Sequence, residues 1–346
     1  MSGVDPAPGA MKFHACESGD GIIVLNMHRQ CIQKELRAAV VGSGVFGRHH
    51  AAKYMRLPGV KFSAVADPDP EQRRQVASNL GLLALADWRD LLGEVDIVSV
   101  CSPASTHAEI VNEFLSAGAH VLVEKPIATE LDEAEELIQL ATERHLVLTV
   151  GHQERFVFAK SGLLDGEAAP LRVECVRAGP WTGRGGDVSV VLDLMIHDLD
   201  LVHRLLPGGI GEVRARGRSV QGRLSDEVSA RIAFENGAVA ELFASRTADA
   251  RKRSMRAIYA DGTIEIDFLA RTVVNTTGRV LRPLDMTDPL GESVAAFVAA
   301  VQSGETALVR PEEARQALET ALMIEEAAEP AREYFASGRP ALRAIA

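Results

Sequence analysis

The sequence predicts an α/β protein with two unlike halves, a parallel sheet in the first and a largely antiparallel, open sheet in the second. From residue 37 to about 150, short β-rich runs alternate with helical segments, the pattern of parallel strands joined by helical crossovers. After residue 151 the expected strands follow one another, and Asn236-Gly237 and Asp261-Gly262 are typical hairpin turns. The second half is therefore expected to be an α+β domain.

Hydrophobic periodicity gives the individual elements. In the first half, strands are expected at 37–41, 61–66, 96–101, 120–123 and 146–150, and helices at 45–56, 70–80, 106–117 and 130–144. In the second half, strands are expected at 171–178, 211–220, 227–235, 238–247, 253–259 and 263–268, and helices at 188–206, 290–303 and 311–328.

A glycine-rich turn follows the first expected strand and opens the first helix. Gly42 permits an unusual backbone angle, Gly44 lets the main chain approach a pyrophosphate, and Gly47 lets the helix pack closely on the strand. The free N–H groups at the helix start, where Val45 and Phe46 lie, attract phosphate. Asp67 ends the second strand, where its carboxylate can accept hydrogen bonds from ribose hydroxyls. The pattern predicts a Rossmann domain that binds NAD rather than NADP, because Asp67 would repel a 2′-phosphate; the alternative is a structural βα turn.

These features predict the division of the chain. A Rossmann domain is expected at 36–150 and a substrate-binding and oligomerisation domain at 151–330, whose open sheet would form a homodimer or homotetramer. Residues 1–35 fit no strand–helix scheme and are expected to be an N-terminal extension, with a disordered tail as one interpretation. Residues 331–346 are expected to be a C-terminal tail.

Composition excludes several classes of function. The chain has 346 residues, of which 47% are hydrophobic and 25% charged, as in ordinary globular proteins. A net charge of −11 argues against nucleic acid as a partner, and no apolar run is long enough to span a membrane. The four cysteines are scattered and no metal-ligand set is evident, so free thiols in a reducing cytoplasm are expected.

Lys125 follows the apolar run Val121-Leu122-Val123 within Glu124-Lys125-Pro126. Open α/β sheets bind ligands at the carboxyl ends of their strands, so Lys125 is expected where a nicotinamide and a substrate hydroxyl meet. Its ammonium can hydrogen-bond a hydroxyl that is becoming a carbonyl. The alternative is a solvated loop lysine.

Asp193 and His197 are four residues apart in an apolar segment, a spacing that puts both on one face of a helix. A buried imidazole near a carboxylate is a candidate general base, here with Asp193 orienting His197. The alternative is a core histidine bonded to a backbone carbonyl.

Further candidates lie at strand ends and in basic clusters. Ser102, Pro103 and His107 follow the strand that ends at Cys101 and are expected on the cofactor side, although a plain βα turn is an equal explanation for His107. Arg155 could line the cleft or be a structural salt-bridge residue. Guanidinium groups bind phosphate or carboxylate in bidentate fashion, so a basic group suggests anion binding, with surface solubility as the alternative. That group comprises Arg177, Trp181 and Arg184, followed by Arg246, Arg251, Lys252 and Arg253.

Together, the glycine turn, Glu124-Lys125-Pro126 and the Asp193-x-x-x-His197 spacing resemble the Gfo/Idh/MocA oxidoreductase family over roughly residues 37–330. The resemblance implies a Rossmann domain with NAD or NADP, a second α/β domain with an open sheet, and sugar or cyclitol substrates. It also implies that Lys125 and His197 are the catalytic lysine and histidine, with Asp193 as the acid of the motif.

A narrower similarity, to bacterial members that oxidise the 3-hydroxyl of UDP-N-acetylglucosamine, rests on four segments, although Val157 stands where those members usually carry Asn. The segments are 191–200, 151–152 with 154–156, 244–246 and 251–256. The similarity implies an NAD-dependent dehydrogenase of a sugar nucleotide in surface-polysaccharide biosynthesis. The alternatives are a dehydrogenase of a free sugar or inositol, an NAD-dependent glycoside hydrolase, and a non-catalytic NAD-bound regulator.

Overall fold

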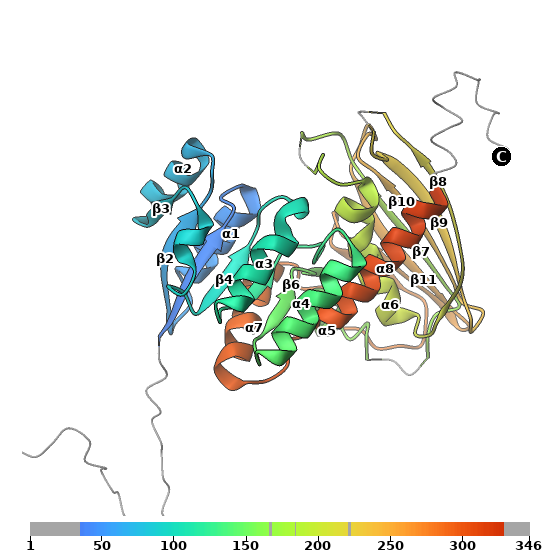
Figure 1. Cartoon of the computed structure of the whole chain (residues 1–346). Helices are drawn as coiled ribbons and strands as arrows, with labels where there is room; N and C mark the ends of the chain where they lie inside the picture. The colour runs from blue at the N-terminus through green and yellow to red at the C-terminus, as the bar shows by residue number, and fades with distance from the viewer. Residues whose placement is uncertain (1–34, 166–167, 184, 221–222, 329–346) are drawn as a thin grey trace, which may run out of the picture. The chain divides into compact units, whose positions relative to one another are not determined.

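A computed structural model describes residues 35–165, 168–183, 185–220 and 223–328, which belong to one compact unit (Figure 1). The expected extension and tail lie outside these residues, apart from Glu35. The helices and strands of the described residues are arranged around two sheets, one from each half of the chain. Two unlike halves, one with a parallel sheet and one with a mostly antiparallel sheet, are confirmed. The domain boundaries at 36–150 and 151–330 stay a prediction.

The first sheet is parallel throughout, with strand order β3-β2-β1-β4-β5-β6. Its strands are β1 (Leu36–Val41), β2 (Val60–Ala66), β3 (Leu83–Leu85), β4 (Ile97–Val100), β5 (His120–Val123) and β6 (Leu148–Val150). The intervening helices are α1 (Val45–Tyr54), α2 (Pro70–Leu80), η1 (Trp88–Leu91), η2 (Ala104–Thr106), α3 (His107–Ser116), α4 (Leu131–Glu143) and, after β6, α5 (Glu154–Ser161). The strand order reverses between β1 and β4, and ligands of open α/β sheets bind at such a switch point.

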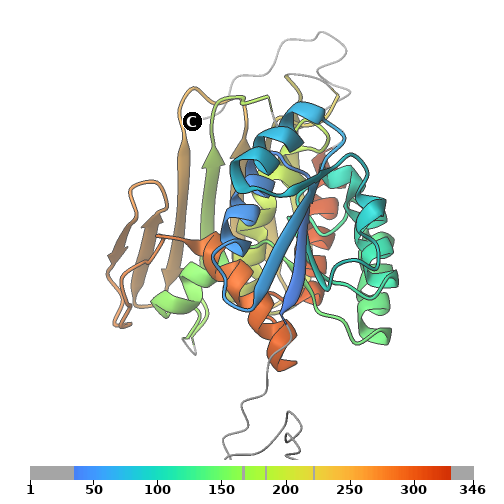
Figure 2. The same ribbon diagram turned by 90° about the vertical axis from the view of Figure 1, so that its left-hand side faces the viewer.

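Both faces of the first sheet are covered, so its strands consist of nearly continuous apolar residues. Side chains of β1 alternate between two cores: Ala38 and Val40 pack on one face, and Ala39 and Val41 on the other. Figure 2 shows teal-to-green helices on one side of the blue strands and an orange helix on the other. The orange helix, α7 (Pro289–Ser303), comes from the end of the chain and contributes Val294 and Phe297 to the core of the first sheet.

The second sheet has the order β13-β12-β11-β7-β10-β9-β8, with β7 and β10 as its parallel pair. Its strands are β7 (Arg172–Ala178), β8 (Ile210–Arg218), β9 (Glu227–Phe234), β10 (Val239–Ser245), β11 (Lys252–Tyr259), β12 (Gly262–Asp267) and β13 (Thr272–Asn275). Buried and more exposed residues alternate along β7 and β9, which is typical of a sheet with one covered face. The covering helices are η3 (Val191–Met195), α6 (Ile196–Leu205) and α8 (Pro311–Ala328).

A buried ion cluster joins three helices that lie far apart in the sequence. Arg155 in α5 donates to both carboxylate oxygens of Asp200 in α6, at 2.8 and 2.6 Å, and also to Glu313 in α8. The side chains of Arg155 and Asp200 are only 3% and 1% exposed. All three groups are therefore used within the protein, and the substrate-binding role expected for Arg155 is corrected to the structural salt bridge that was its alternative.

Replacing Asp200 with Asn should lower the free energy of unfolding by about 3 kcal/mol, because it leaves a buried guanidinium short of its main partner. Urea unfolding measures the change. The matched control is Asp165→Asn, which breaks a pair with Arg282 whose side chains are 61% and 66% exposed and should change stability by less than about 1 kcal/mol. Equal losses in the two variants would contradict the assignment of Arg155 to the fold.

Candidate active site

The turn between β1 and α1 has the shape that a pyrophosphate requires. Gly42 has a φ of +86°, and a Cβ there would lie 2.6 Å from the backbone carbon of Cys101. A Cβ on Gly47 would lie 1.8 Å from the carbonyl oxygen of Gly42. At Gly44, which caps α1, a Cβ would have no protein atom closer than 3.8 Å, and the first turn of α1 holds no acidic residue. The described residues thus fit a dinucleotide, because the helix start is open to phosphate.

Asp67 lies beside this turn, at the end of β2. Its carboxylate accepts hydrogen bonds from the backbone N–H groups of Ser43, at 2.6 Å, and Asp69, at 2.8 Å. These bonds hold both oxygens in place, and each oxygen keeps a lone pair for a ribose hydroxyl. A negative group in this position also disfavours a phosphorylated ribose.

A cavity of about 410 Å³ lies between the carboxyl ends of the first sheet's strands and the second sheet. All three predicted catalytic residues line it: Lys125, Asp193 and His197. Predicted cofactor residues at its wall are Phe46, Ser102, Pro103, His107 and Glu124. The remaining predicted cofactor residues are outside its wall, in the adjoining turn, at the start of α1 and after β2: Gly42, Gly44, Val45, Gly47 and Asp67. Among the predicted substrate residues, the wall includes Arg177, Trp181 and Arg246, whereas Arg184 is outside the described residues.

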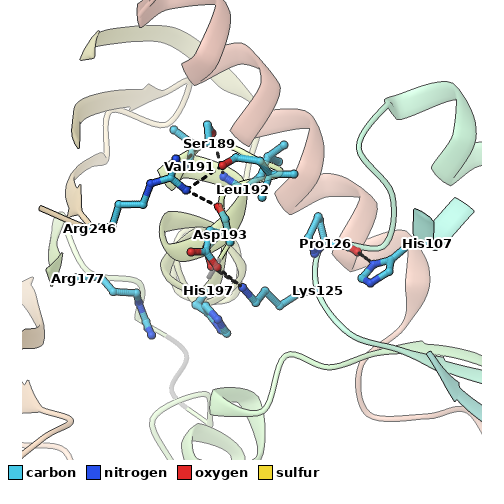
Figure 3. A network of polar contacts seen from close by, with 12 residues as sticks. His107, Lys125, Pro126, Arg177, Ser189, Val191, Leu192, Asp193, His197 and Arg246 are labelled. Carbon is cyan, nitrogen blue, oxygen red and sulfur yellow. Dashed lines mark hydrogen bonds and ion pairs between the residues drawn. The ribbon is translucent and has the colours of Figure 1, made fainter. Parts of the chain in front are cut away.

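Lys125 crosses from the end of β5 to the second domain (Figure 3). Its Nζ donates to the backbone carbonyl of Asp193 and, at 3.2 Å, to that residue's carboxylate. The Lys125 side chain is 11% exposed, so the ammonium is largely shielded from bulk water. An ammonium has three N–H donors. Asp193 takes two of them, and one remains for a ligand oxygen in the cavity.

The backbone around Asp193 is a π-helical turn, η3, where an α-helix was expected from residue 188 to 206. Ile196 N–H bonds to Val191, five residues back. Such wide turns disturb the regular hydrogen-bond ladder and often occur at functional sites. Here the Asp193 carbonyl accepts a bond from Lys125, so main chain and side chain of one residue both hold the ammonium.

His197 is oriented by Glu154, not by Asp193 as the sequence suggested. Its Nδ1 lies 3.0 Å from Glu154 Oε2, and Arg177 Nη1 donates to Glu154 Oε1 at 3.0 Å. Burial opposes ionisation of Glu154, but the facing His197 and Arg177 outweigh it and hold the pKa of this carboxyl well below its usual value. Asp193 and His197 do line the same cavity, as their spacing predicted. The carboxylate of Asp193, however, pairs with Lys125, and His197 pairs with Glu154.

The other residues at the strand ends are held by buried contacts. Glu124 Oε1 lies 3.0 Å from His50 Nε2, and burial opposes its ionisation, yet His50 and Lys125 lower the pKa of Glu124. Nδ1 of His107 lies 2.7 Å from the carbonyl oxygen of Pro126 and Nε2 lies 3.0 Å from that of Ser102, so the ring bridges two strand ends. Burial lowers the pKa of His107 more than these two carbonyls raise it, and a neutral ring donates to one of them.

Two of the predicted arginines of the cavity, Arg177 and Arg246, are already paired within the protein. Arg177 donates to both oxygens of Asp198, at 3.1 and 2.8 Å, and to Glu154. Arg246 donates to Asp226 at 2.7 Å and to the carbonyls of Gly185 and Val188, and its guanidinium lies 4.9 Å from the centre of the Trp181 ring. Both arginines are buried, so they build the cavity wall, and few of their donors remain for a ligand.

Sequence reasoning did not select Glu154, although a signal was present. Glu154 follows the end of β6, just as Lys125 follows β5 and Ser102 follows β4, and the ends of adjacent parallel strands meet at one edge.

Within the described ranges, no helix is both long and apolar enough to cross a lipid bilayer. The same ranges contain no cluster of three His, Cys, Asp or Glu side chains that could hold a metal ion.

A dinucleotide turn beside a cavity that residues of both sheets line is the arrangement of a nucleotide-dependent enzyme. Residues 36–152 match the oxidoreductase family with an NAD-binding Rossmann fold, and residues 168–265 match the GFO/IDH/MocA C-terminal domain. The chain therefore belongs to the Gfo/Idh/MocA oxidoreductase family. Its cofactor is NAD, as the turn and Asp67 predicted.

Two relatives illustrate the range of the similarity. The chain is 38% identical to UDP-N-acetylglucosamine 3-dehydrogenase of Acidithiobacillus ferrooxidans, over 69% of this chain and 76% of that protein. The solved structure of that enzyme is similar with a TM-score of 0.80 at 35% identity, covering 86% of this chain and 99% of the other. The chain is also 28% identical to scyllo-inositol 2-dehydrogenase (NAD(+)) of Bacillus subtilis, over 62% of this chain and 69% of that protein.

His152, next to the site, should make stability depend on pH. It is 1% exposed, packs edge-on against His197, and neither ring nitrogen has a hydrogen-bond partner among the described residues. Burial lowers its pKa from 6.5 to about 4. The unfolded chain therefore takes up a proton first, and stability is lost as pH falls from about 6.5 toward about 4.

When the pH falls from about 7.5 to about 5, the contribution of His152 should lower the free energy of unfolding by about 2 kcal/mol. Urea unfolding at both pH values, compared between the unmodified protein and His152→Gln, isolates this contribution from all other groups. The variant should lose less stability on acidification by that amount. The same pH dependence in both proteins would show that His152 titrates normally in the fold.

Proposed function

We propose that the protein is an NAD-dependent dehydrogenase that oxidises a secondary hydroxyl of a sugar nucleotide, with the 3-hydroxyl of UDP-N-acetylglucosamine as the best candidate. The observation that carries this proposal is one free donor on Lys125 and one free acceptor on His197, facing a common cavity. The similarity to an enzyme named for that substrate supports the choice of sugar.

His197 is suited to remove the hydroxyl proton. Its Nδ1 faces the ionised Glu154, so in the neutral ring the proton is at Nδ1 and the Nε2 lone pair is free. When Nε2 accepts a proton, the imidazolium is stabilised by Glu154 at 3.0 Å. Glu154 thus acts through His197 as a positioning residue.

Lys125 is suited to stabilise the oxygen that loses this proton. Its remaining N–H can donate to that oxygen, and the charge favours alkoxide character as the carbonyl forms. Asp193 holds the ammonium in place through two contacts, so little reorganisation is needed when the substrate binds.

The residues expected to hold NAD are those of the Gly42–Gly47 turn, Asp67, and the cavity wall from Ser102 to His107 with Glu124. When bound there, NAD supplies the acceptor for the hydride that leaves the substrate carbon. His107 keeps the loops after β4 and β5 together, and so fixes the shape of this wall.

A second candidate is a dehydrogenase of a free sugar or cyclitol, which the similarity to an inositol dehydrogenase supports. Thermal shift in the presence of NAD separates the two, because a ligand that binds the folded state raises its melting temperature. Stabilisation by inositols and not by UDP-sugars would favour the second candidate. Net formation of NADH separates either one from a hydrolase or a regulator.

We further propose a homodimer or homotetramer formed through the open face of the second sheet, in a cytoplasmic protein. The face that would form this interface carries charges that pair with each other within one copy: Arg172 with Glu174 and Glu241, and Arg256 with Glu174 and Glu265. Light scattering during gel filtration tests the assembly.

Lys125→Ala and His197→Ala should each lower kcat by about 10²- to 10⁴-fold, since each removes one group that handles the reacting oxygen. NADH formation with UDP-N-acetylglucosamine measures the effect. NAD affinity, measured by calorimetry, should stay within about threefold because the dinucleotide turn is intact. Unaltered turnover in both variants would remove the proposed roles.

Glu154→Gln should lower kcat by roughly 10- to 100-fold and leave KM for both substrates nearly unchanged, because it affects His197 and not the binding surfaces. Steady-state kinetics give the two constants separately. A raised KM with unchanged kcat would mean that Glu154 contacts the substrate instead.

A further inference from the structure

The cavity contains two arginines whose side chains are unpaired, unlike the lysine and the other arginines at its wall. Arg251 and Arg253 line it and are exposed to solvent, and their side chains form no hydrogen bond or ion pair with any residue that the structure describes. The other cations at its wall, Lys125, Arg177 and Arg246, are paired within the fold. Of the acids at the described wall, Glu124 and Asp193 are also paired, and Asp187 is exposed.

These two arginines lie at and just before the beginning of β11. Arg253 pairs with Arg177 of β7, so the two side chains are on the same face of the sheet. Arg251 immediately precedes β11, and a Cβ on Gly179 would lie 3.4 Å from its Cγ, so the arginine stem lies across a glycine. Both guanidinium-bearing residues line the same cavity as Arg177.

The pairing of Arg253 with Arg177 has an energetic cost. Like charges directly opposite each other on adjacent strands are destabilising. Asp198 and Glu154 pair directly with Arg177, whereas they act on Arg253 only from a distance and form no ion pair with it. Two guanidinium groups without a direct partner, in a chain of net charge −11, indicate that an anion from outside completes the site.

The position of the cluster relative to the reacting groups distinguishes this anion from the cofactor phosphates. In Figure 3, Pro126 and His107 lie on one side of Lys125, while Arg177 lies on the other, beyond His197. The dinucleotide turn, Pro126 and His107 all follow strands of the first sheet. In contrast, Arg177 and Arg253 lie in β7 and β11 of the second sheet, and Arg251 directly precedes β11. The anion is therefore on the substrate side.

We infer that Arg251 and Arg253 form the subsite that binds the diphosphate of a sugar-nucleotide substrate and so exclude uncharged polyols. This assignment rests on the proposed function, and it replaces Arg155, Arg177 and Arg246 as the residues that select the substrate's charge. Two guanidinium groups match two phosphates, each of which accepts charge-assisted hydrogen bonds. The exposed ring of Trp181 lies near the same wall, beneath Arg246.

The test is calorimetric titration of the NAD-loaded protein with UDP, uridine and inorganic pyrophosphate, for the unmodified protein, Arg251→Gln and Arg253→Gln. Each substitution should lower the affinity for UDP and for pyrophosphate by about 10-fold or more, because each removes charge-assisted hydrogen bonds. Uridine, which has no phosphate, should bind all three proteins alike. In turnover of UDP-N-acetylglucosamine, KM should rise while kcat changes by less than about threefold.

Arg282→Gln is the matched control, because Arg282 carries the same charge but is 66% exposed in a pair with Asp165 outside the cavity. It should bind UDP as the unmodified protein does. Thermal melting confirms that the variants fold; Arg253→Gln should not destabilise the protein, because it removes a like-charge contact.

The outcomes separate this inference from the proposed function. If UDP-N-acetylglucosamine is oxidised and both arginine variants bind UDP normally, the inference fails and the function stands. If the sugar nucleotide is not a substrate but pyrophosphate binding still depends on both arginines, the anion subsite stands and the proposed substrate fails. If the unmodified protein binds neither UDP nor pyrophosphate, the subsite does not exist.

Discussion

The contact between Lys125 and Asp193 is the interaction on which the site depends, because it joins the edge of one sheet to the helical layer of the other. Lys125 follows β5 in the parallel sheet, and Asp193 lies in η3 above the second sheet. An ammonium that is 11% exposed needs compensating contacts, and it has both a carbonyl and a carboxylate. The same residue that positions the ammonium also anchors the two halves of the cavity to each other.

Acidic side chains decide which basic groups remain available for chemistry. Asp200 and Glu313 occupy Arg155, Asp198 and Glu154 occupy Arg177, and Asp226 occupies Arg246. These buried pairs are worth little as net stability, but each would be costly to break, so they hold the helices and strands in one arrangement. Positive charge alone is therefore a poor guide to ligand binding in this protein. A better guide is a guanidinium that forms no ion pair with an acidic side chain, as at Arg251 and Arg253.

Local sequence patterns were sufficient where the local structure is regular. The bounds of β5, α2 and α8 agree with those expected from periodicity, and the glycine turn is recognisable because steric limits permit only glycine at Gly42 and Gly47. Short or irregular elements were missed, including β3, β13 and α5. Their formation depends on pairing with, or packing against, distant segments. The three residues of β3, the four of β13 and the eight of α5 contain too little periodicity to reveal it.

The choice of partners in the site could not be read from spacing, for a related reason. The interval between Asp193 and His197 correctly puts both side chains on the cavity side of one helical segment. Whether they pair with each other depends on which groups arrive from elsewhere, and Lys125 and Glu154 arrive from the ends of neighbouring strands β5 and β6. A fully charged ammonium is a stronger partner for a carboxylate than a neutral imidazole is.

The contacts of Asp193 in the π-helical turn suit Lys125 for its proposed role. Both the carbonyl and the carboxylate of Asp193 accept hydrogen bonds from the ammonium, which therefore has two fixed contacts and one free donor. Glu154, held in turn by Arg177, gives His197 its own acid and leaves its second nitrogen free. If Asp193 had to serve both residues, the carboxylate would need to shift between them as the proton moved. With separate acids, the base can take up a proton while the ammonium keeps its own contacts, and both keep their positions throughout the proposed reaction.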